Sequence, residues 1–516
     1  MALASGASAQ EHWSGKTAFI LAAVGSAVGL GNLVRFPYVA GDTGGGAFVF
    51  VYLLCIVFIG LPVLMAELMV GRRGGGSAVA AITRLAKVQG ATPAWAIIGW
   101  VGILASFMIV TFYSVLAGWV LHFVIVSLGD LMASIGEQGI GAIAGPAFAG
   151  MSDEEIRGQL GGLLSEPKRM ILMNAIFMAV TVFIISRGIK GGIEIAARFL
   201  MPIFFALLVF LAGFSLISGN ASEALSFLFK PDFARLGATL TDGSILLSAI
   251  GQAFFSLSLG STMMLTYGIY MNADDHIPSS SRIVAATDTG VAMVAGLAIF
   301  PIIFAFPIAA AELQETGAGL GLLFLTLPLA FHEMPFGALF AIAFFIMTLF
   351  AALTSLIALM ETGVALTDGD IDIPAEAKAR RRVIGSIAIG LMAFLIGTGH
   401  ALSQVPTTMI DPVTGAEVAR DTFFNSWEPL GFIPVFSGMT MLDAFDSLTN
   451  NIMLPFGGAC IAIFAGWVMS TTAAREELGF TSERTFKVWQ FLCRYVAPLF
   501  VVAVLIYGAV LAPLLS

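Results

Sequence analysis

Charged residues are scarce in this chain. Asp, Glu, Lys and Arg make up 11% of its 516 residues, whereas about 25% is usual in a soluble domain. Hydrophobic residues make up 58%, and the mean hydropathy is +0.95. This composition excludes a large soluble domain and predicts a polytopic membrane protein whose surroundings are the lipid bilayer.

Cysteine and histidine are also few, and neither is arranged for metal or redox chemistry. Cys55, Cys460 and Cys493 fall in apolar runs without the spacing of metal ligands, so we expect reduced cysteines in the core. The five histidines are scattered, which argues against an intramembrane metalloenzyme. No basic cluster is interleaved with aromatic residues, so we expect no nucleic-acid partner, and the sequence names no protein partner.

Apolar runs that are long enough to cross a bilayer, or nearly so, recur along the whole chain, since a span needs about 20 residues. The eleven candidates are 17–40, 47–70, 95–127, 170–187, 193–218, 244–271, 284–312, 336–366, 383–399, 443–470 and 486–512. With a cytoplasmic N-terminus, the inner loops carry the basic residues Arg72, Arg73, Arg84, Lys87, Arg187, Lys190, Lys378, Arg380, Arg381 and Arg382. The long outer loops, about 128–168 and 400–442, are mostly acidic, so the sequence predicts this orientation.

The first span is interrupted by residues that do not favour a helix. Gly25, Gly29 and Gly31 fall within seven positions, and each glycine costs about 1 kcal/mol relative to alanine in a helix interior. Asn32 and Arg35 follow, and both are unfavourable in lipid. Close packing at a small-residue seam is one explanation of the glycines, but it leaves the two polar residues unexplained. A helix broken at mid-membrane is typical of a site for a small polar solute or ion.

A second interruption lies in the sixth span, between Gly251 and Ser261, where hydroxyls, glycines and a glutamine interrupt an apolar stretch. Breaks five spans apart are the pattern of an inverted-repeat transporter. We therefore predict a single all-α transmembrane domain over 1–516, with repeats at 17–218 and 244–470 and an extra C-terminal helix at 486–512. Such breaks free carbonyl groups for hard cations and half-helix N-termini for a carboxylate.

Other polar residues within the spans fit such a site. Asp288 in the seventh span costs roughly 2.5–3.5 kcal/mol at a helix centre, so it needs a partner, either a cation or a structural arginine. The adjacent hydroxyls of Thr354 and Ser355 either bond back to the preceding turn or coordinate a cation. Tyr113 places a phenol in the third span, where a core aromatic is the alternative.

These blocks of sequence resemble one known family, the neurotransmitter:sodium symporters, in its bacterial branch of LeuT-like and MhsT-like amino-acid transporters. The similarity covers nearly the whole chain and is carried by 13–37, 44–48, 252–260 and 353–355. The resemblance implies a LeuT-type 5+5 inverted repeat with broken first and sixth helices. It also implies a multi-pass protein of the bacterial inner membrane that uses sodium.

The resemblance further implies two sodium sites built from oxygen ligands, which suit a hard cation. The first would use the Ala27 carbonyl, Asn32, Ser256, Asp288 and the substrate carboxylate. The second would use the carbonyls of Gly25, Val28 and Ala351 and the hydroxyls of Thr354 and Ser355.

For the substrate, the resemblance implies an amino acid that is held at both charged ends. Its carboxylate would meet the Leu30 and Gly31 amides and the Tyr113 hydroxyl. Its ammonium would meet the carbonyls of Ala27, Phe255 and Ser256 and the Ser258 hydroxyl. The side-chain pocket would comprise Ser26, Ile109, Phe255, Ser261 and Leu359. The gates would be a lid of Tyr113 and Phe255 and an outer latch of Arg35 and Asp446.

The chain departs from the family pattern near the first sodium site and at the inner gate. The family often has Asn where Asp288 stands, and its chloride-binding serine on the seventh span is Ala292 here. We therefore expect Asp288 to supply the negative charge that chloride otherwise provides. The arginine that commonly precedes the His-Trp pair is Gln10 here, and Lys16 or the run 380–382 are alternative inner-gate cations.

Ser261 indicates the size of the substrate, because it stands where some relatives have Phe and so leaves room for a large side chain. The alternative is that Met263 or Met264 turns inward and fills this room. No side-chain charge in the implied pocket is placed to pair with a charged substrate. The interpretation is a chloride-independent sodium symporter that imports a neutral, hydrophobic or aromatic L-amino acid by alternating access, and not an enzyme. A non-transporting amino-acid sensor on the same scaffold is the alternative.

Overall fold

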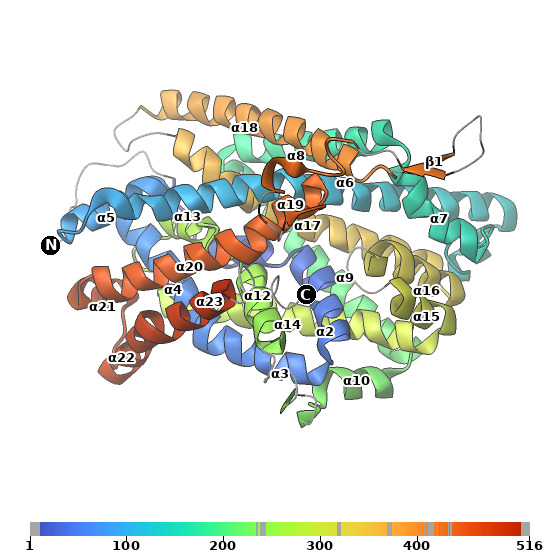
Figure 1. Ribbon diagram of the computed structural model, residues 1–516, viewed down its shortest axis with the longest axis horizontal. Helices are drawn as coiled ribbons and strands as arrows, with labels where there is room; N and C mark the ends of the chain where they lie inside the picture. Colours follow the sequence, from blue (N-terminus) through green and yellow to red (C-terminus); the bar gives the residue numbers. More distant parts are fainter. Residues whose placement is uncertain are drawn as a thin grey trace.

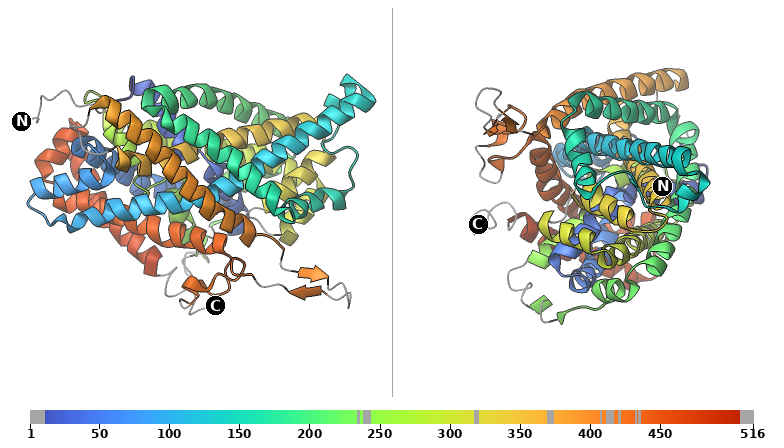
Figure 2. Two further views of the ribbon diagram at one scale, coloured as in Figure 1. Left: turned by 90° about the horizontal axis from the view of Figure 1, so that it is seen from above. Right: turned by 90° about the vertical axis from the view of Figure 1, so that its right-hand side faces the viewer.

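The structure, a computed structural model, describes residues 11–506 apart from 234–235, 238–243, 317–320, 369–373, 407, 411–416, 420–421, 432 and 434–435. It is an elongated helical bundle (Figures 1 and 2). Nine continuous helices of the described residues are long and apolar enough to cross a bilayer, and a bent pair within the first span gives a tenth. Residues 507–512, the end of the last predicted span, lie outside the described residues.

Residues 16–229 contain the first five spans and their connections. The spanning elements are α1 (Lys16–Ala27), η1 (Gly31–Arg35) and α2 (Phe36–Thr43), then α3 (Gly46–Cys55), η2 (Ile56–Gly60) and α4 (Leu61–Gly74), then α6 (Ile97–Gln138), α8 (Pro167–Ser186), and η5 (Ile189–Ile193) with α9 (Glu194–Ser218). The connecting elements are α5 (Ala78–Val88), η3 (Pro93–Ala96), η4 (Ile140–Ala144), α7 (Asp153–Leu164) and α10 (Ala221–Phe229).

Residues 244–506 contain the remaining spans. The sixth span is divided between two short helices, α12 (Ser244–Ser256) and α13 (Met263–Ile269). The other spanning elements are α14 (Ile277–Ala305), α17 (Gly337–Thr367), α18 (Ala375–Ser403), then α19 (Met441–Ser447), η9 (Leu448–Met453), α20 (Leu454–Ile463) and η10 (Phe464–Val468), then α22 (Glu483–Phe491), η11 (Leu492–Val496) and α23 (Ala497–Ile506). The connecting elements are α15 (Pro307–Thr316), η6 (Leu322–Thr326), α16 (Leu327–Glu333), β1 (Thr408–Ile410), β2 (Glu417–Ala419), η7 (Glu428–Leu430) and α21 (Thr471–Leu478).

Three elements differ from what the sequence predicts. The third span does not end near 127, because α6 continues to Gln138 and is 42 residues long. The seventh span lies earlier than the predicted 284–312, because His276 caps its start by accepting a hydrogen bond from the Ser279 amide and Pro307 begins a separate helix. A short antiparallel β1–β2 hairpin, which an all-α prediction does not contain, lies between α18 and α19.

The long helices form a framework around the two broken spans. Helices α6, α8 and α18 pack side by side on one flank, and α17 packs against both α6 and α9 (Figures 1 and 2). Helix α1 packs between α9, α14 and α17, and α13 packs against α4 and α17. The framework therefore holds the gaps of both broken spans toward the middle of the bundle.

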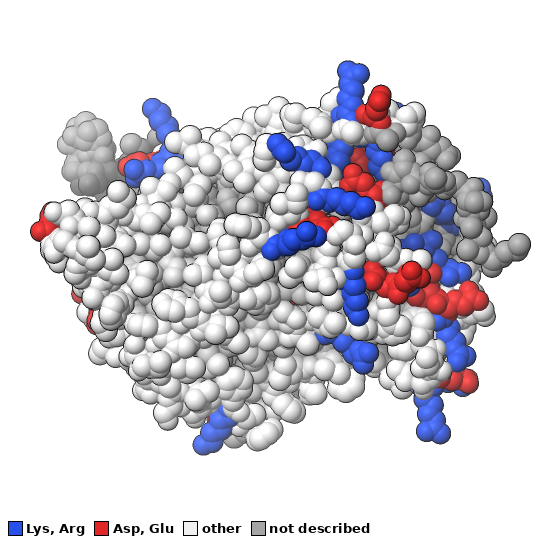
Figure 3. All heavy atoms as spheres, turned by 180° about the vertical axis from the view of Figure 1, so that it is seen from behind, with Lys and Arg blue, Asp and Glu red and all other residues white. Residues whose placement is uncertain are grey.

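Charge is distributed unevenly over the surface. Figure 3 shows Lys and Arg side chains gathered, with some acidic ones, toward one end of the face it presents, next to a broad area without charge. This charged end of the molecule contains α5, α21 and α22 (Figure 1). The β1–β2 hairpin lies toward the other end. The uncharged area has the character of a surface that contacts hydrocarbon.

Candidate functional site

The first element of the site is the gap between α1 and η1. Helix α1 ends at Ala27, and Val28 has the extended backbone angles φ −74° and ψ 109°. The helix resumes at Gly31 in a direction bent by 51°. Because the backbone hydrogen-bond ladder stops here, carbonyl groups at the end of α1 have no partner within the helix.

Two of the glycines predicted to weaken this helix also allow close contacts across the gap. A Cβ atom on Gly29 would lie 2.6 Å from the Ser355 hydroxyl oxygen and 2.8 Å from that of Tyr113. One on Gly31 would lie 2.6 Å from the Phe255 ring. Glycine at these positions therefore lets α6, α12 and α17 reach the broken backbone, which any larger residue would prevent.

The second element is the gap between α12 and α13, which spans 257–262 and contains three residues with positive φ. These are Ser258 at 53°, Gly260 at 80° and Thr262 at 59°. The buried carboxylate of Glu67 on α4 accepts hydrogen bonds from the amides of Gly260 (2.7 Å) and Leu265 (3.3 Å). Glu67 therefore replaces helix hydrogen bonds that the unwound segment lacks.

Asp288 on α14 is completely buried and lies between the two gaps. The Asn32 side-chain nitrogen donates to Asp288 Oδ1 (2.8 Å) and to the Asp288 carbonyl oxygen (3.0 Å). The Ser256 hydroxyl donates to Asp288 Oδ2 (2.6 Å), and Tyr52 donates to the Ser256 hydroxyl (3.4 Å). The three side chains predicted for the first sodium site thus meet in one cluster, and Ala27 lines the adjoining cavity.

A structural arginine was the alternative partner of Asp288. Among the described residues, no ion pair includes Asp288. Its hydrogen-bond partners are neutral, so its negative charge is available to a cation. The Asn32 oxygen accepts from the Gly29 amide in this conformation (3.2 Å).

The two adjacent hydroxyls on α17 behave differently from each other. Thr354 donates to the preceding turn, at 3.1 Å from the carbonyl oxygens of both Phe350 and Ala351. Ser355 instead donates across the gap to the Val28 carbonyl oxygen (3.2 Å). Thr354 also lies next to α1, since a Cβ on Gly25 would be 3.4 Å from the Thr354 Cβ. The five residues predicted for the second sodium site are therefore neighbours at the end of α1.

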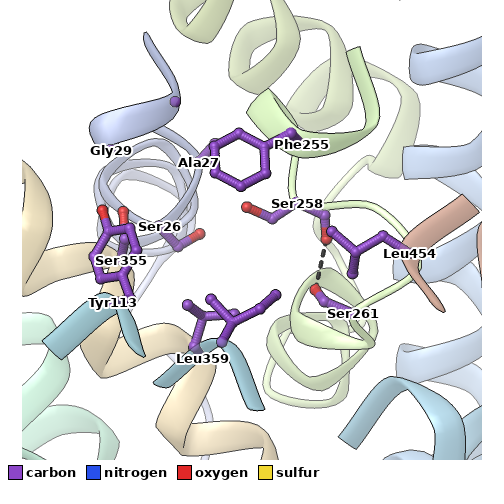
Figure 4. Close-up of a pocket in the computed structure, with 12 residues that line it drawn as sticks. Ser26, Ala27, Gly29, Tyr113, Phe255, Ser258, Ser261, Ser355, Leu359 and Leu454 are labelled. Carbon is purple, nitrogen blue, oxygen red and sulfur yellow. Dashed lines mark hydrogen bonds between the residues drawn. The ribbon is translucent and has the colours of Figure 1, made fainter. Parts of the chain in front are cut away.

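A cavity of about 30 Å3 lies between the two gaps (Figure 4). Nine of the predicted substrate residues line it, namely Ser26, Ala27, Gly31, Ile109, Tyr113, Phe255, Ser258, Ser261 and Leu359. The other two lie directly behind this lining, because the Leu30 amide donates to the Tyr113 hydroxyl (3.1 Å) and Ser256 belongs to the Asp288 cluster.

The residues predicted for the lid and the latch border a second cavity. Tyr113 and Phe255 border both the small cavity and an outer cavity of about 340 Å3. Arg35 and Asp446 also line the outer cavity, but these two described residues form no direct ion pair. The Arg35 guanidinium lies 4.7 Å from the centre of the Phe255 ring, and Asp446 accepts a hydrogen bond from Asn450 (2.6 Å).

The opposite end of the bundle is closed by buried side chains. The Trp13 indole donates to the Tyr267 carbonyl oxygen (3.2 Å) and is 2% exposed. Arg382 is buried and forms ion pairs with Glu361 (2.5 Å) and Asp368 (3.1 Å). Of the alternative inner-gate cations, Arg382 is therefore in a buried ion network, while Lys16 is exposed and donates to the Ser279 hydroxyl (3.3 Å). Gln10 lies outside the described residues.

Sequence reasoning missed two residues of these sites. Leu454 lines the small cavity, and Glu361 is the buried partner of Arg382. Gly29, which the sequence marks only as a residue of the helix break, also lines the cavity. An acidic residue inside an apolar span was a usable signal for Glu361. Leu454 gave no signal, because a leucine in an apolar helix looks like any other core residue. Met263 and Met264, the predicted alternative filling, are both buried and are not among the residues that line the cavity.

Comparisons with known proteins agree with this geometry. The sodium:neurotransmitter symporter family matches residues 10–134 and 158–408. An uncharacterized sodium-dependent transporter of Bacillus subtilis, YhdH, is 33% identical over 96% of both chains, and one of Haemophilus influenzae is 29% identical over 96% of this chain and 98% of its own length. The crystal structure of MhsT in complex with L-phenylalanine superposes with a TM-score of 0.78, at 35% identity, over 97% of this chain and all of MhsT.

These similarities identify both the fold and the general activity. The fold is that of LeuT-like transporters, with the first and sixth helices broken. The relatives are sodium-dependent transporters and not enzymes. This multi-pass, sodium-dependent symporter belongs to the sodium:neurotransmitter symporter family.

Proposed function

We propose that this symporter carries a neutral, hydrophobic or aromatic L-amino acid by alternating access. The observation that supports it is the composition of the small cavity, whose lining residues include no Asp, Glu, Lys or Arg. Hydroxyls and broken backbone border one part of it, and Ile109, Leu359 and Leu454 border another. A zwitterion with an apolar side chain matches both parts. The complex of MhsT with L-phenylalanine adds support from a relative.

Two sodium ions are proposed to accompany the amino acid. The first would lie at the Asp288 cluster, where the Asn32 amide would turn its oxygen toward the ion and the substrate carboxylate would complete the shell. The second would lie where Ser355 meets the Val28 carbonyl oxygen. All the proposed ligands are oxygen atoms, as a hard cation requires.

Chloride independence is proposed from the same cluster. Tyr52, Gln252 and Ser256 stand where chloride-dependent members bind the anion, and Ser256 already donates its hydrogen to Asp288 (2.6 Å). Ala292, one turn after Asp288 on α14, offers no hydrogen-bond donor. The Asp288 carboxylate would therefore provide the negative charge, and a chloride ion beside it would be repelled.

We place the protein in the bacterial inner membrane with a cytoplasmic N-terminus. Basic residues dominate the loops at the α5 end, where Arg72, Arg73 and Arg84 lie. The repeats would be 17–218 and 244–470, followed by the extra helix 486–512. The Tyr113–Phe255 lid and the Arg35–Asp446 latch would then close the outer side, and the opening of the Trp13 end would release the substrate inside.

Uptake into proteoliposomes tests this function. The full chain is reconstituted, and labelled alanine, leucine, phenylalanine, tryptophan, glutamate and lysine are each supplied with an inward sodium, potassium or proton gradient. Sodium-driven accumulation of the apolar amino acids alone is the expected result. Sodium-dependent binding without accumulation would favour a sensor, and accumulation of glutamate or lysine would contradict the proposed substrate class.

A further inference from the structure

One wall of the small cavity comes from the tenth span, which the sequence connects with the outer latch and not with the substrate. Leu454, the first residue of α20, lines the cavity and is 2% exposed. Figure 4 shows its side chain beside Ser261 and across the cavity from Ser26. Leu454 and Tyr113 lie on opposite sides of the cavity in this view.

Ser261 does not fill the space next to Leu454. Its hydroxyl donates to the Ser258 carbonyl oxygen (2.6 Å) and accepts from the Met263 amide (3.3 Å), so it is used by the unwound backbone. The Leu454 side chain lies beside this small residue in Figure 4. Ser261 and Leu454 both line the cavity, and Leu454 has the larger side chain of the two.

The backbone of α20 is held in place at this wall. A Cβ on Gly260 would lie 1.9 Å from the Leu454 carbonyl oxygen, and one on Gly457 would lie 2.4 Å from the Gly260 carbonyl oxygen. The unwound segment of the sixth span and the first turn of α20 are thus in direct backbone contact. Since interiors are closely packed, a change in the size of side chain 454 should change the cavity more than it moves the helix.

We infer that Leu454 determines specificity, by setting how long a substrate side chain the cavity accepts. This inference rests on the proposed amino-acid substrate. A larger residue at position 454 would exclude aromatic substrates and leave small ones unaffected, and a smaller residue would favour the largest substrates. A difference of one methylene in an apolar pocket changes selectivity about 10- to 200-fold, and the exchange of leucine for alanine or phenylalanine is larger than that.

The test measures sodium-dependent binding of alanine, leucine, phenylalanine and tryptophan to the purified full chain. Leu454→Phe should lower the affinity for tryptophan relative to alanine by about tenfold or more, and Leu454→Ala should raise it. Ile461→Ala is the matched control, because Ile461 is 1% exposed on the same helix and does not line the cavity. The control should leave the tryptophan-to-alanine ratio unchanged.

A rescue experiment separates a pocket wall from a general packing residue. Ser261→Phe should weaken tryptophan binding by filling the same space, and adding Leu454→Ala should restore it. Unchanged tryptophan-to-alanine ratios in Leu454→Ala and Leu454→Phe, with binding retained, would overturn the inference alone. Failure of the unaltered chain to bind any of the four amino acids would overturn the proposed function together with it. If Leu454→Phe does not fold, Leu454→Ala and the rescue decide the question.

Discussion

The Asp288 cluster and the Ser355–Val28 contact lie on opposite sides of the first helix break, and they differ in charge. Asp288 brings a carboxylate that two neighbours already orient, at 2.6 Å from the Ser256 hydroxyl and 2.8 Å from the Asn32 amide. The contact around Ser355 has only neutral oxygens, from hydroxyls and from carbonyls of α1. A cation at the first place would be held by charge, whereas one at the second would depend on backbone shape.

This difference indicates that the two proposed sodium sites have different roles. The charged site would be next to the substrate carboxylate in the proposed binding mode, so ion and substrate would stabilise each other there. The neutral site exists only while α1 ends near Val28, so its ion would favour that conformation over others. An ion shifts a conformational equilibrium only by its different affinity for the two states.

The largest effect is expected from Asp288→Asn, which keeps the shape of the side chain and removes its charge. Loss of one partner of a buried charge interaction costs about 3–5 kcal/mol, and about 1.4 kcal/mol is a factor of ten. Sodium-driven phenylalanine uptake should therefore fall at least about 100-fold. The initial rate of uptake, measured over a range of sodium concentrations, checks this. An uptake rate within a few-fold of that of the unaltered chain would contradict the view that charge holds the ion at the Asp288 cluster.

A smaller effect is expected from Gly29→Ala, which tests the contact between the break and α17. The new Cβ would lie 2.6 Å from the Ser355 hydroxyl oxygen and 2.8 Å from that of Tyr113. Overpacking of this kind costs about 1–3 kcal/mol, so substrate affinity should drop about 5- to 150-fold. Gly213→Ala is the matched control, because a Cβ there meets nothing within 4 Å. Equal affinities in the two variants would show that the close approach is not required.

Ser355→Ala should have a modest effect that is specific for sodium. The lost hydrogen bond to the Val28 carbonyl oxygen is worth about 0.5–1.5 kcal/mol, so the half-saturating sodium concentration should rise about 2- to 10-fold. The control is Thr348→Val on the same helix, because Thr348 donates to the preceding turn at the Phe344 carbonyl oxygen (2.8 Å). A sodium dependence that shifts equally in both variants would argue against an ion at Ser355.

Replacement of chloride by gluconate should have no effect. In the proposed mechanism Asp288 would provide the charge that chloride supplies in chloride-dependent members, and the Ala292 side chain nearby cannot donate a hydrogen bond. Uptake of labelled phenylalanine in the two media, at equal sodium, measures this directly. A collapse of uptake in gluconate would mean that the Asp288 site is incomplete without an anion.

Most of the central site could be predicted from the sequence, because its residues conflict with their surroundings. Glycines at 25, 29 and 31 weaken a helix, and Asp288 is costly in an apolar span. Each of these positions therefore indicates a special role. The structure brings Asp288 together with Asn32 and Ser256, as the resemblance implies. The division of Thr354 and Ser355 between two kinds of partner could not be predicted, since both bonds are available to a helix hydroxyl.

Residues whose chemical character matches that of their neighbours gave no such signal and could not be predicted. Leu454 is apolar in an apolar helix, so only its position shows that it borders the cavity. Helix α6 continues to Gln138, beyond the end of the hydrophobic stretch that marks the span. Hydropathy therefore does not reveal this extension. Of three consecutive arginines, only Arg382 is buried, while 380 and 381 are exposed, a distinction that depends on which helix face meets Glu361.

Sodium binding to the purified protein, with and without L-phenylalanine, tests the central claim most directly. If substrate and sodium share the Asp288 site, the amino acid should raise the sodium affinity by about tenfold, within the usual coupling of about 1–3 kcal/mol. The coupling should disappear in Asp288→Asn and persist in Ser355→Ala. A sodium affinity that is the same with and without phenylalanine in the unaltered chain would contradict the account.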